Sequence, residues 1–338
     1  MIKIEGSQGG GQVLRSALSL SVITQQPFRM VDIRGQRGEG GLKYQHRAVV
    51  KAMQELCNAE VKGAELKSRE IEFVPKRIVK DRVDVDIGTA GSATLVLQTI
   101  IPVLFHEQKS MVVRVRGGTD TSHCPPSMYF LHIYGWMLRR IGAEFSCDIK
   151  RFGFFPKGGG EIEVVFDRAH PLKKIVFRER GVLGKVDVHA VAARQLQSRR
   201  VAERMIEGFR SHMPSGVKVK DHVWYGDALN PGGVLHAHVH YDNYKVGESV
   251  LCEPGRKSED VGGECAEKVK RLMKGDGVDK YLGDQVMVYM GLCGSGDVRV
   301  SEVTDHMRTN AQVIERFLPV RFRISDTRVV CKKRRNEG

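Results

Sequence analysis

Hydrophobic and polar positions near the end of the chain alternate in one segment and take up helical spacing in the next. Residues 298–303 alternate valine with arginine, serine and glutamate, which predicts a strand. Residues 311–318 place apolar residues at helical spacing, and Pro319 ends that pattern. His306 stands between the two, so we expect it at a strand-to-helix corner where backbone N–H groups bind an anion. Three residues can cap this turn: Asp305, Thr309 and Asn310.

The same order of elements occurs three times, which indicates a repeat. Each unit combines two predicted helices with the strands of one small sheet. The helices are expected at residues 14–21 and 44–57 in unit one, 94–105 and 127–141 in unit two, and 284–292 and 310–317 in unit three. One such unit would bury little apolar surface, so we expect the three to pack together.

A segment of different character interrupts the third unit. Residues 185–275 contain their own pattern of strands and two helices, which is enough for a small inserted α/β domain. The repeats then occupy residues 1–184 and 276–338, and the expected fold class is α+β. The basic tail from Lys332 to Arg335 is interpreted as a solvated, disordered terminus.

Composition adds a charge to this picture. The 338 residues have a formal net charge of +14, which favours an anionic partner such as nucleic acid, with a merely basic surface as the alternative. Hydrophobic residues make up 41% of the chain, and no apolar run approaches the roughly 20 residues of a membrane span. No signal peptide is visible, and the seven cysteines form no C-x-x-C pair, so we expect reduced thiols in a cytoplasmic protein.

Glycine clusters are the candidates for phosphate binding, because the chain has no P-loop and no dinucleotide-binding motif. Gly9–Gly11 and Gly88–Gly91 each precede a predicted helix, whose free N–H groups and dipole favour phosphate. Tight turns between repeats are the alternative interpretation. A second phosphate-binding set lies close in sequence: Arg15, Arg34 and Arg37 with Gln45. Guanidinium groups bind phosphate in a bidentate manner, although these arginines could also be solvated surface charges.

Three histidines alternate along one predicted strand. His236, His238 and His240 would point to the same face, where they could bind a metal. No cysteine or carboxylate flanks them at ligand spacing, although Asp242 is near, and an exposed strand face is the alternative.

Several longer motifs match a known family over nearly the whole chain. They are Gly9 to Ser21, Gly88 to Thr99, Gly117 to Asp120 with Pro125-Pro126, Gly153 to Gly160, Tyr281 to Gln285, and His306 with Arg316 to Phe322. On these motifs the chain resembles the RNA 3′-terminal phosphate cyclases. The resemblance implies three two-helix, four-stranded units like the C-terminal domain of a bacterial translation initiation factor, with a small inserted domain.

The resemblance also implies a reaction in three steps. A histidine attacks the α-phosphorus of ATP, AMP then passes to an RNA 3′-phosphate, and the neighbouring 2′-hydroxyl finally closes a 2′,3′-cyclic phosphate. His306 matches the family nucleophile. The resemblance implies that Asp284 orients the histidine or the ribose. It implies that adenine is held by Tyr281, Pro125 and Tyr129, and that nucleotide or phosphate is contacted by Gln98 and Gln285. The phosphates would be held by Arg15, Arg34, Arg37 and Gln45. ATP, Mg²⁺ or Mn²⁺, and RNA with a 3′-phosphate end are the implied ligands, and the oligomeric state is left open.

Two departures from the family pattern leave alternatives open. The loop Gly6 to Gln12 is two residues shorter than usual and has no glutamate, the residue expected to bind the catalytic metal. Phe152 stands where a basic residue is usual, with Arg151 next to it. The shortened loop favours a non-catalytic RNA-binding factor in ribosomal RNA processing, whereas His306 favours an enzyme. Adenylylation of other phosphorylated ends is a third hypothesis.

Overall fold

The computed structural model describes residues 1–334, apart from the side chains of residues 168 and 169, and arranges them around four sheets of four strands. Three of these sheets share one topology. In each, the first two strands are parallel and the other pairs are antiparallel, and the spatial order of the strands is first, second, fourth, third. The threefold repeat predicted from the sequence is therefore present, and the fold is α+β.

Units one and two are continuous in sequence. Unit one contains β1 (Ile2–Glu5), α1 (Gly11–Thr24), β2 (Phe28–Val31), α2 (Tyr44–Cys57), β3 (Glu60–Lys62) and β4 (Ile71–Val74). Unit two contains β5 (Arg82–Asp86), α3 (Ala93–Glu107), β6 (Met111–Gly117), α4 (Ser127–Tyr129), a π-helix η1 (Phe130–Tyr134), α5 (Gly135–Ile141), β7 (Ala143–Arg151) and β8 (Gly160–Ala169). Since α4, η1 and α5 follow one another without a break, they occupy the single helix expected at 127–141.

Unit three is split by the insertion. It contains β9 (Ile175–Phe177), α8 (Lys280–Gln285), α9 (Met287–Cys293), β14 (Ser295–Arg299), α10 (Asp305–Phe317), β15 (Val320–Ser325) and β16 (Arg328–Lys333). The inserted segment contains β10 (Leu183–Ala193), a 3-10 helix η2 (Arg194–Arg199), α6 (Val201–His212), β11 (Val219–Gly226), β12 (Gly233–Tyr241), β13 (Lys245–Leu251) and α7 (Ser258–Lys274). Its sheet has the order β11-β10-β12-β13, which none of the three repeats has. The exact domain boundaries stay a prediction.

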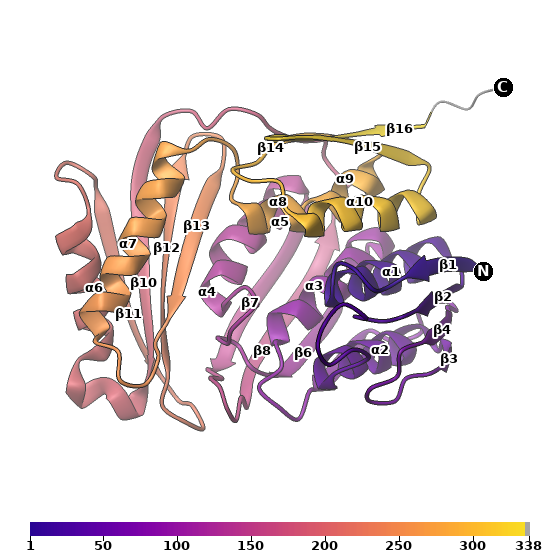
Figure 1. Cartoon of the computed structure of the whole chain (residues 1–338), viewed down its shortest axis with the longest axis horizontal. Helices are drawn as coiled ribbons and strands as arrows, with labels where there is room; N and C mark the ends of the chain where they lie inside the picture. Colours follow the sequence, from indigo (N-terminus) through magenta and orange to yellow (C-terminus); the bar gives the residue numbers. More distant parts are fainter. Residues whose placement is uncertain (335–338) are drawn as a thin grey trace.

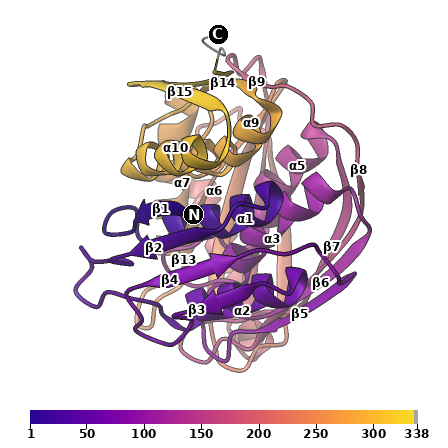
Figure 2. The ribbon, with the colours of Figure 1, turned by 90° about the vertical axis from the view of Figure 1, so that its right-hand side faces the viewer.

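Helix α1 lies at the centre of the repeats. It packs against α2, α3 and α10, so it contacts all three units, while the sheets lie towards the outside (Figures 1 and 2). Ten of its fourteen residues are buried, among them Leu14, Leu18 and Leu20 with essentially no exposed surface. The small side chains Ser16, Ala17 and Ser19 allow this close approach of neighbouring helices.

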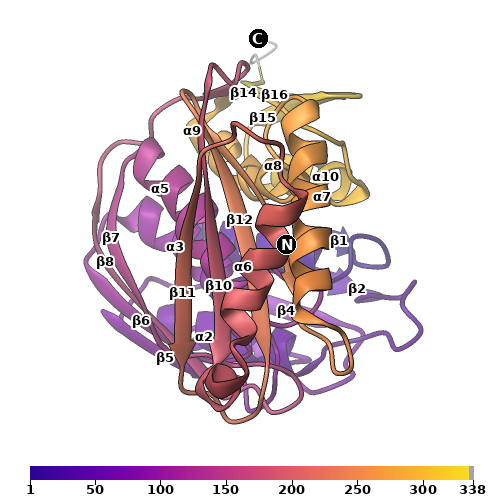
Figure 3. The ribbon, with the colours of Figure 1, turned by 90° about the vertical axis from the view of Figure 1, so that its left-hand side faces the viewer.

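The two α-helices of the insertion lie on the same face of its sheet. Helices α6 and α7 pack together and cover the outer side of β10, β12 and β13, as Figure 3 shows. The other face of the sheet is turned towards unit two, where β13 contacts α4 and η1. A small apolar cluster joins the two parts: Phe152 and Phe154 from unit two pack with Met128, Val191 and Val234. Phe152 therefore contributes to docking of the insertion.

The start of α10 differs from the expectation. The helix begins at Asp305 rather than Asn310, because the Thr304 hydroxyl accepts a hydrogen bond of 3.3 Å from the backbone N–H of Met307. The cap is thus Thr304 and none of the three predicted residues. The preceding strand β14 ends at Arg299, four residues earlier than expected. His306 accordingly occupies the first helical turn instead of the corner before it.

Two further expectations about unit three are wrong. Asp284 and Gln285 end α8 rather than open a helix, because Asp279 caps that helix through the N–H groups of Tyr281 and Leu282. The basic tail is also partly ordered, since Lys332 and Lys333 pair with β15 as part of β16. Arg335 lies outside the described residues.

No helix within residues 1–334 combines the length and the apolar character needed to cross a membrane. All seven cysteines are free.

Strand β9 was not anticipated, and polar contacts fix it in the third sheet. Arg178, just after β9, and Arg328 on β16 both donate hydrogen bonds to the buried carboxylate of Asp297 on β14. Arg180 is also buried and donates to the carbonyl oxygens of Leu272 and Gly277, where the chain leaves the insertion. These contacts hold the outgoing and returning segments of the insertion side by side.

We expect Asp297→Asn to lower the free energy of unfolding at pH 7 by about 1.5–3 kcal/mol, because hydrogen bonds to a charged group are lost. The hydrogen bonds from Arg328 and Arg178 lower the pKa of Asp297. Its stabilising effect is therefore complete above its unfolded pKa of about 3.9, and it is lost as the pH falls through the lower folded pKa. Denaturant unfolding should show the difference from wild type shrinking in acid. A control, Asp148→Asn on the exposed end of β7, should change little, and equal effects of both variants would contradict the assignment.

Candidate active site

His306 is exposed on the first turn of α10. Thr304 accepts hydrogen bonds from the N–H groups of Met307 and Arg308, whereas those of Asp305 and His306 have no partner among the described residues and remain available to an anion. One turn later, the Thr309 hydroxyl donates hydrogen bonds to the carbonyl oxygens of Asp305 and His306, at 3.0 and 3.2 Å. These bonds tighten the turn that presents the imidazole to solvent.

Asp284 faces this turn from the end of α8. The Asn310 side-chain amide donates to its carboxylate at 3.1 Å and to its backbone carbonyl at 3.2 Å. The amide oxygen of Asn310 accepts a 2.7 Å hydrogen bond from the hydroxyl of Ser16 on α1. Burial raises the pKa of Asp284, whereas the neighbouring His306 and Arg15 lower it. A carboxylate so placed is suited to orient the imidazole and to balance the charge of the arginine.

The first glycine loop lies directly against the start of α10. Gly9 and Gly10 have φ angles of 72° and 58°, a left-handed conformation that glycine adopts without strain. A Cβ atom on Gly9 would lie 2.7 Å from the Thr309 hydroxyl oxygen, and one on Gly11 would lie 2.4 Å from Nε2 of His46. Only glycine fits at these two positions, so the N-terminus of α1 stays close to His306.

Cationic side chains surround the same loop. Arg15 approaches Gly11, and the guanidinium of Arg37 lies within van der Waals distance of a Cβ built on Gly10. Burial lowers the pKa of Arg15 to about 10, with Asp284 opposing the shift, so Arg15 is charged at neutral pH. Arg34 instead holds its own loop, because its guanidinium donates hydrogen bonds to the carbonyl oxygens of Glu39 and Gly41 at 3.0 Å. Arg37 is exposed and Arg15 is half-buried, which leaves these two better placed to meet a phosphate.

His46 completes this group. Its side chain is buried and accepts a hydrogen bond from the N–H of Lys43. Burial lowers the pKa of His46 to about 3, and Arg15, Arg34 and Lys43 lower it further. The ring is therefore neutral, with Nε2 directed at the glycine loop, where it can donate a hydrogen bond.

A small pocket with a cavity volume of about 30 Å³ lies behind Arg15, between the helices of all three units. It is lined by Gln12, Arg15, Ser16, Ser19, Gln98, Pro102, Tyr134, Gln285, Val288, Tyr289 and Asn310. Within the part of the chain that the structure describes, Nε2 of Gln98 and Oε1 of Gln285 are buried and have no hydrogen-bond partner. Because buried polar atoms are normally paired, these two amides remain available to a bound group or water.

The predicted adenine-binding residues form a second cluster, on α8 and α4. Tyr281 is 44% exposed, and burial of the rest of its ring, with Glu248 and Asp279 nearby, raises its pKa to about 12. Tyr129 is buried, donates a 2.6 Å hydrogen bond to Asp279, and meets Tyr281 edge-on with ring centroids 6.0 Å apart. Tyr129 therefore supports the exposed ring from behind. Pro125 is half-buried just before α4.

Gln45 connects the first two units. Its side-chain oxygen accepts a 3.1 Å hydrogen bond from the N–H of Ser92, which caps α3 after the second glycine cluster. Gln45 therefore fixes the position of that glycine loop, and its side-chain oxygen is occupied by this hydrogen bond.

The structure thus brings His306, Asp284, Arg15, Gln98 and Gln285 together around α1 and α10. Sequence reasoning missed Ser16, His46 and the structural role of Asn310, although the last was named as a cap. The signal for Ser16 and His46 was their place beside recognised residues, Arg15 and Gln45.

Divalent metal ligands near His306 are few. In the part of the chain that the structure describes, groups of three or more close histidine, cysteine or carboxylate ligands occur only around the inserted sheet. Asp284 is one carboxylate close to His306 and Arg15, and Asp305 directly precedes His306 on α10. Mg²⁺ binds proteins through one or two carboxylates together with phosphate oxygens and water, so a site assembled with the nucleotide fits this arrangement.

Comparison with known proteins shows the family to which the chain belongs. The family model described as RNA 3′-terminal phosphate cyclase matches residues 7–324. Relatives named RNA 3′-terminal phosphate cyclase include that of Pyrococcus abyssi, 37% identical over 94% of this chain and 93% of the relative. That of Pyrococcus furiosus is 34% identical over 96% and 95%, and that of Saccharolobus solfataricus is 35% identical over 97% of both chains. The chain belongs to the RNA 3′-terminal phosphate cyclase family.

Proposed function

We propose that this protein uses ATP to convert an RNA 3′-terminal phosphate into a 2′,3′-cyclic phosphate, with His306 as the nucleophile. Family membership supports the overall reaction. The observation that most directly supports the histidine mechanism is the position of His306. It lies exposed on the first turn of α10, beside Asp284 and against the glycine loop.

In the first step a ring nitrogen of His306 forms a bond to the α-phosphorus, the bond to the β-phosphate breaks, and pyrophosphate leaves. Neutral imidazole is a competent nucleophile near pH 7, and the resulting phosphoramidate is reactive enough to pass AMP on. Arg15, Arg37 and the N–H groups at the start of α1 would neutralise the phosphates. Asp284 would hold the imidazole in position.

In the second step an oxygen of the RNA 3′-phosphate attacks the α-phosphorus, and the bond to His306 breaks. The 2′-hydroxyl then loses its proton and attacks the activated 3′-phosphorus, and AMP leaves. The same cationic site would serve both substrates, because pyrophosphate departs before the RNA phosphate arrives. The net charge of +14 favours the approach of RNA.

We also propose that Mg²⁺ or Mn²⁺ assists. When bound, such an ion neutralises phosphate charge and polarises the reacting phosphoryl group. Asp284 would bind the ion in place of the missing loop glutamate. Arg15 and Arg37 would share in neutralising the phosphates. The shortened loop keeps the non-catalytic RNA-binding factor as the competing function. A cytoplasmic location and the natural RNA stay predictions.

The decisive experiment is incubation of the full chain with α-labelled ATP and either Mg²⁺ or Mn²⁺. We expect a protein-bound label that survives denaturation and is absent in His306→Ala, because His306 is the proposed nucleophile. His106→Ala, which removes an exposed histidine at the end of α3, should keep the label. RNA binding without any label, under either metal, would favour the non-catalytic function.

Asn310→Ala should reduce the rate of label formation about 10- to 100-fold, because Asp284 loses a hydrogen bond to its charged group. Single-turnover kinetics would measure this rate. Gln312→Ala, an exposed residue on the same helix, is the matched control and should be neutral. A slower rate in both variants would point to a general disturbance of α10 instead.

Tyr281→Ala should raise the KM for ATP about two- to tenfold through lost stacking, with a smaller effect on kcat. Tyr281→Phe keeps the ring and should behave as wild type, since the phenol is protonated at neutral pH. An equal loss in the two variants would argue against adenine stacking.

A further inference from the structure

The face of the inserted sheet that is turned towards unit two is rich in histidine. Six of the twelve histidines in the chain gather here, with neighbouring ring centroids between 4.1 and 5.4 Å apart. They are His132 from η1 and His189, His222, His236, His238 and His240 from β10, β11 and β12. The candidate active site uses none of them.

Strand pairing explains why the rings share a face. His236, His238 and His240 alternate along β12, so they project to the same side. In the antiparallel register His189 lies opposite His236, and Asp187 lies opposite His238. The intervening residues of β12 point to the side covered by α6 and α7. The face expected to be exposed is in fact buried: His236 and His238 have 0% and 1% of their surface exposed.

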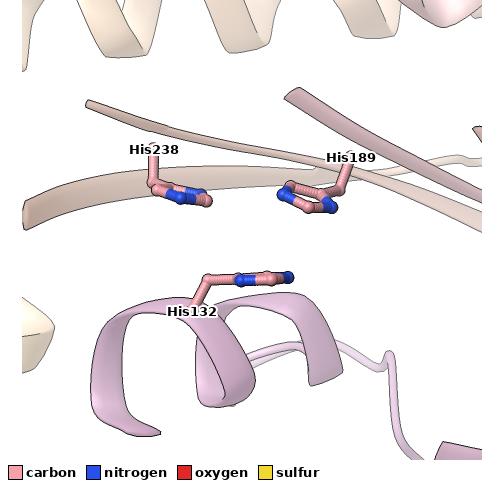
Figure 4. Close-up of side chains that lie close together, drawn as sticks. All are labelled: His132, His189 and His238. Atoms are coloured by element: carbon pink, nitrogen blue, oxygen red, sulfur yellow. The ribbon is translucent and has the colours of Figure 1, made fainter. Parts of the chain in front are cut away.

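Three of the rings bring possible metal-ligand atoms close together. One ligand atom from each of His132, His189 and His238 lies within 4.8 Å of the others. Figure 4 shows the ring of His132, from η1, lying beneath those of His189 and His238, which project from neighbouring strands, with all three rings nearly parallel. Zn–N bonds are about 2.1 Å, so tetrahedral ligands stand about 3.4 Å apart. Nitrogen lone pairs lie in the plane of an imidazole ring. His132 stacks on His189 and His238 at interplanar angles of 25° and 15°, so its ring would have to turn to direct a nitrogen at an ion held by the other two.

The same rings have unpaired nitrogen atoms. Among the described residues, neither nitrogen of His189 has a hydrogen-bond partner, although the residue is only 3% exposed. Nδ1 of His238 is also buried and unpaired, as is Nε2 of His236. Buried polar atoms are nearly always satisfied in native proteins, so several unpaired nitrogens in one place indicate that a ligand belongs there.

The surroundings of the triad include both signs of charge. Asp187 accepts a 2.7 Å hydrogen bond from His240, lies 3.8 Å from His238, and is paired with Lys185. Lys245 is a second cation near the rings. A carboxylate oxygen of Asp187 also lies within 4.8 Å of ligand atoms of His238 and His240, so Asp187 is close enough either to orient these rings or to join the ligands of an ion.

The nitrogen ligands indicate which class of metal the site would bind. Neutral imidazole prefers zinc, copper or nickel, whereas Mg²⁺ prefers oxygen ligands. The half-exposed rings of His222 and His240 mark the side from which an ion would enter.

We propose that His132, His189 and His238 bind one divalent transition-metal ion of the zinc type, with water in the fourth position. Because the ligands come from η1 and from two strands of the insertion, the bound ion fastens the inserted sheet to unit two. The site is separate from the magnesium-assisted chemistry at His306, and it does not depend on the proposed reaction.

The test uses the full chain, treated with a chelator, dialysed and then titrated with Zn²⁺ in the absence of nucleotide. Competition with a chromophoric chelator gives the affinity, and elemental analysis gives the stoichiometry. We expect one equivalent of zinc, a higher Tm with zinc than without it, and the visible absorption of tetrahedral Co²⁺ when cobalt replaces zinc. Substoichiometric zinc in the wild-type chain would overturn the proposal and leave a metal-free stack of neutral rings.

Variants assign the ligands. His132→Ala should lose at least tenfold in zinc affinity, together with the zinc-dependent rise in Tm, whereas His106→Ala should keep both. His132→Gln, closer in size, is the second variant if alanine unfolds the chain, and circular dichroism checks each fold. Equal zinc affinity in wild type and in a folded His132 variant would refute the site. Labelling of the chain by α-labelled ATP is measured separately, so failure of one proposal is distinguishable from failure of the other.

Discussion

The buried hydrogen bond from Ser16 to Asn310 is the contact on which the candidate active site depends. This bond, 2.7 Å long, joins α1 of the first unit to α10 of the third, and the Asn310 amide in turn donates a hydrogen bond to Asp284. Ser19 makes the corresponding contact with the second unit, since its hydroxyl donates to the carbonyl oxygen of Thr99 at 2.6 Å. Both bonds require helix backbones at close range, which the small residues of α1 permit. The three repeats thus meet at one helix, and that helix begins at the first glycine loop.

A second polar centre connects the active site with the insertion. Asp279 is fully buried and accepts hydrogen bonds from the Tyr129 hydroxyl, from two N–H groups of α8 and from Gly247 on β13. Tyr129 in turn contacts Tyr281 on one side and His236 on the other, with centroids 6.0 and 5.8 Å apart. The exposed ring of Tyr281 is therefore supported by a residue that also touches the histidine-rich face. Through this contact, the position of the insertion is coupled to that of Tyr281.

The elements with strong local signals agree with the sequence analysis. Helix α2 spans the expected residues 44–57 and strand β12 spans 233–241, because both have clear periodicity and well-marked ends. The starts of α8 and α10 were misplaced, since the capping side chains Asp279 and Thr304 lie upstream of the apolar pattern on which the prediction relied. Strand β9 has only three residues and acquires its partner β14 about 120 residues later, so no local pattern marks it.

The sequence by itself determined the repeat, the glycine loops and the residue types of the site, because periodicity, glycine placement and family motifs are local properties of the chain. Only the tertiary structure decided which polar groups are free to act. Arg34 donates hydrogen bonds to backbone carbonyls and Tyr129 donates one to Asp279, whereas Nε2 of Gln98 and Oε1 of Gln285 have no partner among residues 1–334. The histidines of β12 likewise became a cluster through the register with β10 and the approach of η1. Burial and hydrogen-bond partners depend on residues far apart in the chain, and for that reason they follow from packing rather than from local pattern.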